Sequence, residues 1–368
     1  MKEGLKMSKE YFTRRQDKLR TVLAEKSLDG MLVTNMVHIR YLCGFTGSSG
    51  SLLVGPDMCE FITDGRYVVQ SKNEVRGANI TIDSIPHLEV INKKNFLSNG
   101  LTIGFDGNNV SHQVFSNIRK VLSHVKWENI VGCIEALAME KDKKEIEAIK
   151  TAVEITDRAF AEVFPMIKIG VEEQEIGNQL SFLYRKYGDS DADAFSPIVG
   201  SGPHSAMPHQ RPTDKKIAAG ELVVIDSGAK YAGYHADMTR TVATKGYSEK
   251  QKEIYDIVLQ AQLKSIKGIK TGVSCKEIDS LARDHISNAG YGKYFDHGLG
   301  HSLGLEIHED PRFSKVSTDF LKSNYVMTVE PGIYIEDIGG VRIEDDIVVT
   351  DDSCIVLNKT SKDFTVIS

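Results

Sequence analysis

Residues 222–237 read LVVIDSGAKYAGYHAD, and this stretch decides how the second half of the chain is expected to fold. The apolar, β-branched run before Asp226 predicts a buried strand, and a second acid, Asp237, follows on the predicted return strand. An ionised carboxylate at the end of a buried strand needs a compensating partner. The stretch therefore predicts a pair of strands with two acids that something else must neutralise.

The same pattern recurs in two later apolar runs. VMTVEPG (326–332) places Glu330 directly after a strand-like run, and GGVRIEDDIVV (339–349) places Glu344 inside one. Four converging carboxylates would raise one another's pKa, and they could not stay buried and ionised without cations. Two divalent ions would balance them. Oxygen-rich ligation favours Mn²⁺, Co²⁺ or Mg²⁺ over a thiolate-type zinc site.

An internal repeat indicates how acids far apart in the chain could meet. IKIGVEEQEI, from Ile167, matches IKTGVSCKEI, from Ile269, and the offset of these copies is close to that between Asp226 and Glu330. Each copy follows a predicted helix and leads through a second helix toward strands. If a pseudo-twofold axis relates the two halves, corresponding strand ends meet near that axis. The repeat thus predicts that the acids converge on one place.

Composition limits the partners of this protein. The 368 residues are 41% hydrophobic, which is enough for one large domain or two, and the net charge of −6 gives no basic field for nucleic acid or an anionic membrane. Five scattered cysteines without a CxxC pair indicate free thiols in a reducing compartment. No apolar signal core or membrane span is visible. We expect a cytoplasmic protein that acts on a small molecule or a peptide.

The first part of the chain predicts a separate α/β domain. An amphipathic helix is expected from Lys9 to Lys26, and strands and helices then alternate. We place the N-terminal domain at residues 1–135 and the second domain at 136–368, which opens with a charged helix from about Lys141. The Gly- and Ser-rich stretch RYLCGFTGSSG (40–50) is interpreted as a tight turn between strands rather than a substrate-facing loop.

Several histidines accompany the acids. FDHGLGHSLGLEIHEDP (295–311) contains His297, His301 and His308, and AMPHQRPT (206–213) contains His209. HGLGH lacks the glutamate of a zincin motif, and GLGHSLG is one residue too long for a dinucleotide fingerprint. Each of these residues alone is more simply explained as a turn or surface residue. Together with the acids they indicate a metal site.

The second domain resembles the pita-bread metallopeptidases, which include aminopeptidase P, prolidase, methionine aminopeptidase and the metal-free creatinase. The motifs that carry this resemblance, in family order, are SPIVGSG, PHQRPT, VVIDSGAKYAGYHADMTRT, GHSLGLEIHEDP, VEPGIY and VRIEDD. The resemblance covers nearly the whole chain, because several of these enzymes share the preceding α/β domain. It implies an α+β fold: an N-terminal α/β domain, then a pita-bread domain with a pseudo-twofold repeat and a curved antiparallel sheet.

The resemblance also implies roles for individual residues. Two metal ions would be held by Asp226, Asp237, His301, Glu330 and Glu344. Mn²⁺ is the expected ion, with Co²⁺ or Zn²⁺ as alternatives, and Asp237 and Glu344 would bridge the pair. The matches to residues that bind substrate, stabilise the transition state or orient the ligands are His209, His297, His308 and Arg342. Tyr334 is similar to a residue near the substrate pocket, and His235 is interpreted as structural.

The implied activity is hydrolysis of the bond between an N-terminal residue and a proline in second position. A hydroxide bridging the metals would attack, and Glu330 would shuttle the proton. We favour an Xaa-Pro aminopeptidase over an Xaa-Pro dipeptidase (prolidase), from the resemblance of the GFTGSSG loop. A metal-free creatinase-like hydrolase or a non-enzymatic binding protein is disfavoured because all five ligand types are present. The family also implies a homodimer. Ser302 replaces a glycine of many relatives and could narrow the approach to His301.

Overall fold

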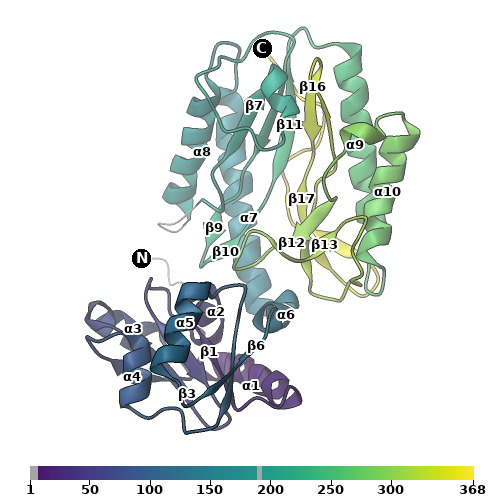
Figure 1. Ribbon diagram of the computed structural model, residues 1–368. Helices are drawn as coiled ribbons and strands as arrows, with labels where there is room; N and C mark the ends of the chain where they lie inside the picture. Colours follow the sequence, from purple (N-terminus) through teal and green to yellow (C-terminus); the bar gives the residue numbers. More distant parts are fainter. Residues whose placement is uncertain (1–6, 189–192) are drawn as a thin grey trace. The chain divides into compact units, whose positions relative to one another are not determined.

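The computed structural model describes residues 7–188 and 193–368 (Figure 1). The chain divides into two compact units, unit 1 at Met1–Ala138 and unit 2 at Met139–Ser368. The division falls near the end of helix α6 (Cys133–Met139), so the chain passes between the units in a helix. The assignment of residues 1–135 and 136–368 to two domains stays a prediction.

Unit 1 is an α/β unit built on one mixed six-stranded sheet in the order β4-β3-β2-β1-β5-β6. Its strands are β1 (Gly30–Val33), β2 (Ser51–Val54), β3 (Cys59–Thr63), β4 (Asn79–Ile82), β5 (Thr102–Phe105) and β6 (Lys126–Asn129). Its helices, besides α6, are α1 (Lys9–Glu25), α2 (Met36–Cys43), α3 (Val68–Glu74), α4 (His87–Lys93) and α5 (His112–Val121). Leu32, Leu53 and Ile62 from neighbouring strands pack in its core.

The prediction of a turn between strands at residues 40–50 was wrong for its first part. Residues 40–43 form the end of helix α2, which begins where the Asn35 side chain accepts hydrogen bonds from the N–H groups of Val37 and His38. The helix ends at Gly44, whose φ of 85° needs a glycine. Only the residues after Gly44 form the connection to β2. The helix is too short for its periodicity to be recognised beside the Gly- and Ser-rich residues that follow.

Unit 2 contains the same succession of elements twice, which confirms the repeat. The first copy has helices α7 (Lys143–Val163) and α8 (Glu173–Tyr187), then strands β7 (Ile198–Ser201), β8 (Leu222–Asp226) and β11 (Thr239–Thr244). The second has α9 (Glu249–Gly268) and α10 (Cys275–Asn288), then β12 (Gly300–Ser302), β14 (Val326–Val329) and β17 (Asp345–Val349). Within each copy the three strands pair antiparallel in chain order.

Each copy also carries a short hairpin between its second and third strands. The hairpins are β9 (Lys230–Tyr231) with β10 (Tyr234–His235), and β15 (Gly332–Ile335) with β16 (Gly339–Arg342). Three strands extend the sheets at their edges: β13 (Glu309–Phe313), β18 (Cys354–Val356) and β19 (Val366–Ile367). This is the α+β fold with an internal repeat and antiparallel sheets that the sequence predicted.

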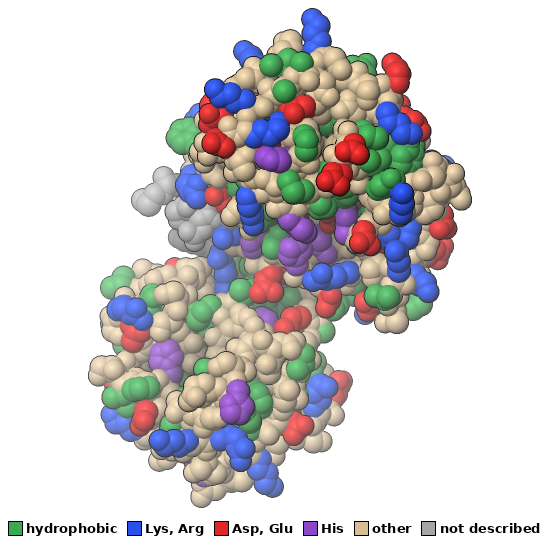
Figure 2. All heavy atoms as spheres, turned by 45° about the horizontal axis from the view of Figure 1, so that its top comes forward, with side chains coloured by type: hydrophobic (Ala, Val, Ile, Leu, Met, Phe, Trp, Pro, Cys, Tyr) green, Lys and Arg blue, Asp and Glu red, His purple; other side chains and the backbone are tan. Residues whose placement is uncertain are grey.

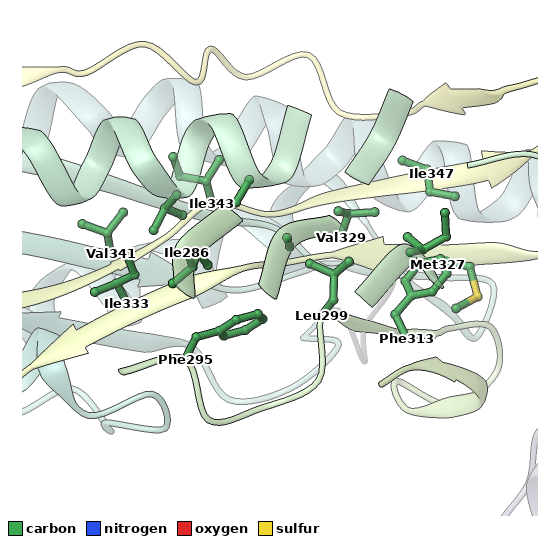
Figure 3. Close-up of a cluster of buried hydrophobic side chains, with 14 of the residues drawn as sticks. Ile286, Phe295, Leu299, Phe313, Met327, Val329, Ile333, Val341, Ile343 and Ile347 are labelled. Atoms are coloured by element: carbon green, nitrogen blue, oxygen red, sulfur yellow. The ribbon is translucent and has the colours of Figure 1, made fainter. Parts of the chain in front are cut away.

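Apolar side chains join the helices to one face of each sheet. In the second copy, Met327 and Val329 of β14 and Ile347 of β17 are fully buried in a cluster with Ile286 of α10, as Figure 3 shows. The first copy has its own cluster between α7, α8 and the strands β7, β8 and β11. Burial of these faces leaves the opposite face of each sheet for polar residues.

Candidate metal centre

Strand alternation places the acids of the first copy on the face away from the helices. Val223 and Ile225 of β8 pack against α7 and α8, so the next residue, Asp226, points to the opposite face. Met238 lies in the same apolar cluster, so its neighbour Asp237 also points away from it. Both acids are buried. The apolar pattern of these strands thus sets the direction of their carboxylates.

The second copy follows the same rule. Met327 and Val329 of β14 pack toward α9 and α10, which leaves Glu330 on the other face. Ile347 of β17 packs in the same cluster, so Glu344, three residues before it, also lies on the other face. Glu344 is 1% exposed. Acids from both copies therefore face a common space, as the repeat predicted.

The structure brings all five predicted ligands to one pocket. Asp226, Asp237, His301, Glu330 and Glu344 line a pocket of about 590 Å³. His301 Nε2 lies 3.4 Å from Glu330 Oε1 and 3.7 Å from Asp237 Oδ2. One donor atom from each of Asp237, His301 and Glu344 lies within 4.8 Å of the others. These separations suit donors that converge on cations.

Burial and mutual repulsion disfavour the charged form of the acids. Burial, and then the neighbouring Glu344 and Asp226, raise the pKa of Asp237 well above its usual range. Burial, and then Glu330 and Asp226, raise the pKa of Glu344 in the same way. Burial raises the pKa of Glu330 to about 7, although Arg342 opposes it. The positive charge of Arg342 alone does not balance these four acids.

The oxygen atoms without partners show where positive charge fits. Asp226 Oδ1, Asp237 Oδ1 and Glu344 Oε1 are buried and accept no hydrogen bond from the described residues. The second oxygens of two of these acids are held: Arg342 donates to Asp226 Oδ2, and Thr239 Oγ1 donates to Glu344 Oε2 at 2.6 Å. Buried oxygens are seldom left unpaired. Divalent cations would satisfy them, so the residues fit a metal centre.

The contacts of His301 select the nitrogen atom that can act as a ligand. Its Nδ1 lies 3.0 Å from the carbonyl oxygen of Ser302, so Nδ1 carries the proton and Nε2 is free to bind. Burial lowers the pKa of His301 to about 3, which keeps the ring neutral. A neutral imidazole with Nε2 directed at Asp237 and Glu330 is the form that binds a metal.

Sequence reasoning missed two supports of the centre, Thr239 and Asp346. Thr239 accepts a hydrogen bond from Arg342 Nε at 3.0 Å and holds Glu344. Asp346 Oδ2 accepts the backbone N–H of Asp237 at 2.9 Å. Asp346 stands two residues after Glu344 and therefore shares its strand face. That alternation was the available signal, but the run EDD resembles a solvated surface.

The predicted histidines lie around the same pocket. His209, His297 and His308 line it, and the rings of His301 and His308 meet edge to face at 4.5 Å between centroids. Figure 2 shows histidine side chains gathered on the surface of the upper body, which is unit 2. Burial lowers the pKa of His297 to about 4 and also lowers that of His308. Both rings are neutral hydrogen-bonding groups near neutral pH.

Arg342 and Tyr334 connect the histidines to the acids. Arg342 donates to Asp226, to Tyr334 Oη at 2.8 Å and to the Pro208 carbonyl at 3.3 Å. Tyr334 Oη also lies 3.1 Å from His297 Nε2. Arg342 is 3% exposed, so its charge acts inside the site. The position of Arg342 agrees with a role in orienting the ligands.

Ser302 and His235 do not face the pocket. Ser302 is fully buried in β12, and its hydroxyl donates to the Val326 carbonyl at 2.9 Å, so it does not narrow the approach to His301. His235 Nδ1 lies 3.0 Å from the Gly304 carbonyl, a contact that holds the chain near His308.

Among residues 7–188 and 193–368, no helix is both long and apolar enough to cross a bilayer.

Comparisons with known proteins agree with this geometry. Residues 147–351 match the description of metallopeptidase family M24, and residues 15–139 match the creatinase/prolidase N-terminal domain. The Xaa-Pro dipeptidase of Pyrococcus furiosus is 36% identical over 95% of this chain and 99% of its own.

Two solved structures are similar over nearly the whole chain. The Xaa-Pro dipeptidase from Bacillus anthracis has a TM-score of 0.93 and 39% identity, covering 97% of this chain and 100% of its own. The X-Pro aminopeptidase from Thermotoga maritima has a TM-score of 0.88 and 38% identity, covering 96% of this chain and 99% of its own.

Proposed function

Because the chain belongs to metallopeptidase family M24 and carries the creatinase/prolidase N-terminal domain, we propose that it is an Xaa-Pro dipeptidase that works with two divalent metal ions. The observation that carries the proposal is the set of converging ligands with three buried carboxylate oxygens that no described donor satisfies. A metal-free enzyme of this fold would not require five converging ligand side chains.

Five residues would hold the metals: Asp226, Asp237, His301, Glu330 and Glu344. When bound, the ions supply a water-derived nucleophile and polarise the peptide carbonyl. Mn²⁺ is the proposed ion, with Co²⁺ or Zn²⁺ as alternatives, since carboxylate and imidazole ligands bind all three. Bound cations would also remove the repulsion that raises the pKa of Asp237 and Glu344.

The other steps of hydrolysis, which are proton transfer and stabilisation of the developing charge, are assigned to residues that line the pocket. Glu330 takes a proton from the attacking water and returns it to the leaving nitrogen. His308, as a neutral imidazole, donates a hydrogen bond to the oxygen that becomes negative. His209 lines the same pocket and is proposed to act on the leaving-group side, and Arg342 donates a hydrogen bond to the carboxylate of Asp226. The leaving prolyl nitrogen must be protonated as the bond breaks, and Glu330 is the group proposed to deliver that proton.

We now favour a dipeptidase over an aminopeptidase, which reverses the preference that rested on the resemblance of the GFTGSSG loop. Two of the similar proteins named above are Xaa-Pro dipeptidases. Arg312 also lines the pocket, its side chain is 57% exposed, and its nearest acid, Asp310, lies 3.6 Å away. Such a cation would pair with the free carboxylate of a dipeptide. An Xaa-Pro aminopeptidase is the second candidate, supported by the X-Pro aminopeptidase among the similar structures.

A substrate panel with the Mn²⁺-loaded protein tests the proposal. We expect rapid cleavage of Xaa-Pro dipeptides and slow cleavage of Xaa-Pro-Yaa-Zaa peptides, with Xaa-Ala dipeptides as the control for proline specificity. Preferential cleavage of the longer peptides would make the aminopeptidase the correct assignment. No cleavage of either class with Mn²⁺, Co²⁺ or Zn²⁺ would reject both.

Metal count, assembly and location remain to be measured. We propose two metal ions per chain, a homodimer of twice the 40.8 kDa chain and a cytoplasmic location. Metal analysis and light scattering of the purified protein test the first two. One ion per chain at saturation, or a monomer at all concentrations, would contradict them.

A further inference from the structure

We propose that Glu173 is a positioning residue that fixes the pocket segment, residues 201–213, and thereby places His209 at the active site. The inference rests on the proposed function for the role of His209, whereas the placement itself rests on contacts. Glu173 is the first residue of α8 and is fully buried, yet the sequence offered no reason to select it.

The carboxylate of Glu173 joins the two ends of the pocket segment. Oε1 accepts the backbone N–H and the hydroxyl of Ser201, both at 2.8 Å. Oε2 accepts the hydroxyl of Thr213 at 2.8 Å and its N–H at 3.2 Å. His204 Nδ1 lies 3.0 Å from Oε2 and 3.1 Å from Oε1. One side chain therefore closes the segment into a loop.

The start of α8 reinforces this closure through its backbone. The N–H groups of Glu173 and Gln174 donate to the carbonyl oxygens of Lys215 and Thr213, so residues of the segment's end satisfy the free donors of the helix. Burial alone would raise the pKa of Glu173, but hydrogen bonds from His204, Ser201 and Thr213 outweigh it and lower the pKa. Glu173 thus holds the segment as a carboxylate.

The segment held in this way forms one wall of the pocket. Pro208, His209 and Arg211 line it. At the middle of the segment, Arg342 donates hydrogen bonds to the Pro208 carbonyl oxygen and to Asp226. At the start of the segment, strand β7 pairs with β8, and Ile198 lies opposite Asp226. The segment is therefore fixed at its ends by Glu173 and at Pro208 by a residue that also contacts a metal ligand. His209, next to Pro208, is exposed to the pocket and depends on this frame.

Amide hydrogen exchange of Glu173→Gln tests the placement without any activity measurement. The glutamine has nearly the same volume, but its NH₂ faces donors and cannot accept from them. We expect the rate of amide exchange in residues 201–213 to rise about tenfold or more, because the substitution removes a hydrogen bond to a charged group. The exchange rate in β8 should not change. The matched control is Glu175→Gln, an exposed acid in the same helical turn, which should leave the segment unchanged.

A double-mutant cycle tests the functional part of the inference. On an Xaa-Pro dipeptide with saturating Mn²⁺, Glu173→Gln should lower kcat/KM by roughly 10- to 100-fold. In a His209→Ala background the same change should cost only about twofold, because its effect acts through His209. Metal content should stay at the wild-type value. Thr213→Val, which removes one donor to Glu173, carries the same tests if Glu173→Gln does not fold.

The outcomes separate this inference from the proposed function. Unchanged exchange in the segment, or losses that multiply in the double mutant, would overturn the role of Glu173. If the wild-type protein cleaves no prolyl peptide but the exchange rises as expected, the Xaa-Pro assignment fails and the placement of His209 by Glu173 is supported.

Discussion

Glu330 is the residue for which we propose two roles, as a metal ligand and as the proton carrier. It follows β14 directly, lies 3.4 Å from His301 Nε2 and accepts a hydrogen bond from Thr328 at 3.1 Å. Burial raises its pKa to about 7 in the metal-free chain, and a bound cation would lower the pKa again. The atoms that face His301 therefore have the position for the proposed transfer.

We expect Glu330→Gln to bind an Xaa-Pro substrate but lose turnover by roughly 10²- to 10⁴-fold, because an amide cannot carry the proton. Steady-state kinetics give kcat, and an equilibrium titration with substrate gives its affinity. Glu336→Gln, which changes an exposed acid of the β15–β16 hairpin outside the pocket lining, is the control. Near-normal turnover would remove Glu330 from the role of proton shuttle.

Asp237, one of the proposed metal ligands, should lower the stability of the metal-free protein as pH rises. Its pKa is raised by burial, so the folded chain keeps a proton that the unfolded chain releases above about pH 4. Since the native state then binds more protons, the contribution of Asp237 to stability falls as pH rises.

Asp237→Asn should therefore stabilise the metal-free protein, and the gain should grow between pH 5 and pH 8. The size of the gain at the higher pH reports how far burial and the neighbouring acids raise the pKa of Asp237. Urea unfolding in the presence of a chelator measures the difference. A gain that shrinks toward pH 8 would show that the sign of the pKa shift is wrong.

At the scale of the element, the connection between β8 and β11 places two ligands with little freedom. Asp226 ends β8, and the hairpin β9-β10 returns the chain to Asp237. Gly228 lies where a Cβ would meet the Ala236 carbonyl oxygen at 1.7 Å, so the two sides of this connection touch through their backbones. Only a glycine allows this approach.

Gly228→Ala should accordingly destabilise unit 2 by about 1–3 kcal/mol and weaken metal binding, because the backbone must move beside Asp226 and Asp237. Urea unfolding and a Mn²⁺ titration measure the two effects. Gly65→Ala is the control, since a Cβ there meets nothing within 4 Å. Unaltered stability and metal affinity would mean that the connection is not constrained by this contact.

At the scale of the whole molecule, the two copies of unit 2 are joined across the pocket. Each copy has its own apolar cluster with its own helices. Arg342 of the second copy bonds Asp226 of the first, and Thr239 of the first bonds Glu344 of the second. A metal bound by ligands from both copies would therefore stabilise the unit as a whole.

Mn²⁺ at about 100 times its Kd should add about 2.7 kcal/mol to the stability of the folded protein. For a unit of this size the unfolding midpoint should rise by about 5–11 °C. Calorimetry with Mn²⁺ and with a chelator measures the shift, and chelation should also abolish peptide cleavage. The shift should vanish in Asp237→Asn. A protein that retains its activity after exhaustive chelation would not be a metallopeptidase of the proposed kind.

The sequence by itself determined the repeat and the faces of the strands, and its resemblance to the family selected the five candidate ligands that the structure brings to one pocket. The sequence repeat that starts at Ile167 and Ile269 corresponds to two matching successions of helices and strands. The alternation of apolar residues before Asp226 and Glu330 sets the direction of their side chains. These features depend on residues a few positions apart, so a local pattern carries them. Helix α2, where glycines and serines masked a short helix, escaped the same reasoning.

Only the tertiary structure decided which groups meet. The bond of Arg342 to Asp226 joins residues 116 positions apart. The contacts of Glu173 join the start of helix α8 to Ser201 at the end of β7 and to Thr213 in a loop. The tautomer of His301 and the buried oxygens without partners likewise depend on neighbours that no local pattern names. Such contacts follow from strand register and packing, which are properties of the folded chain and not of any one segment.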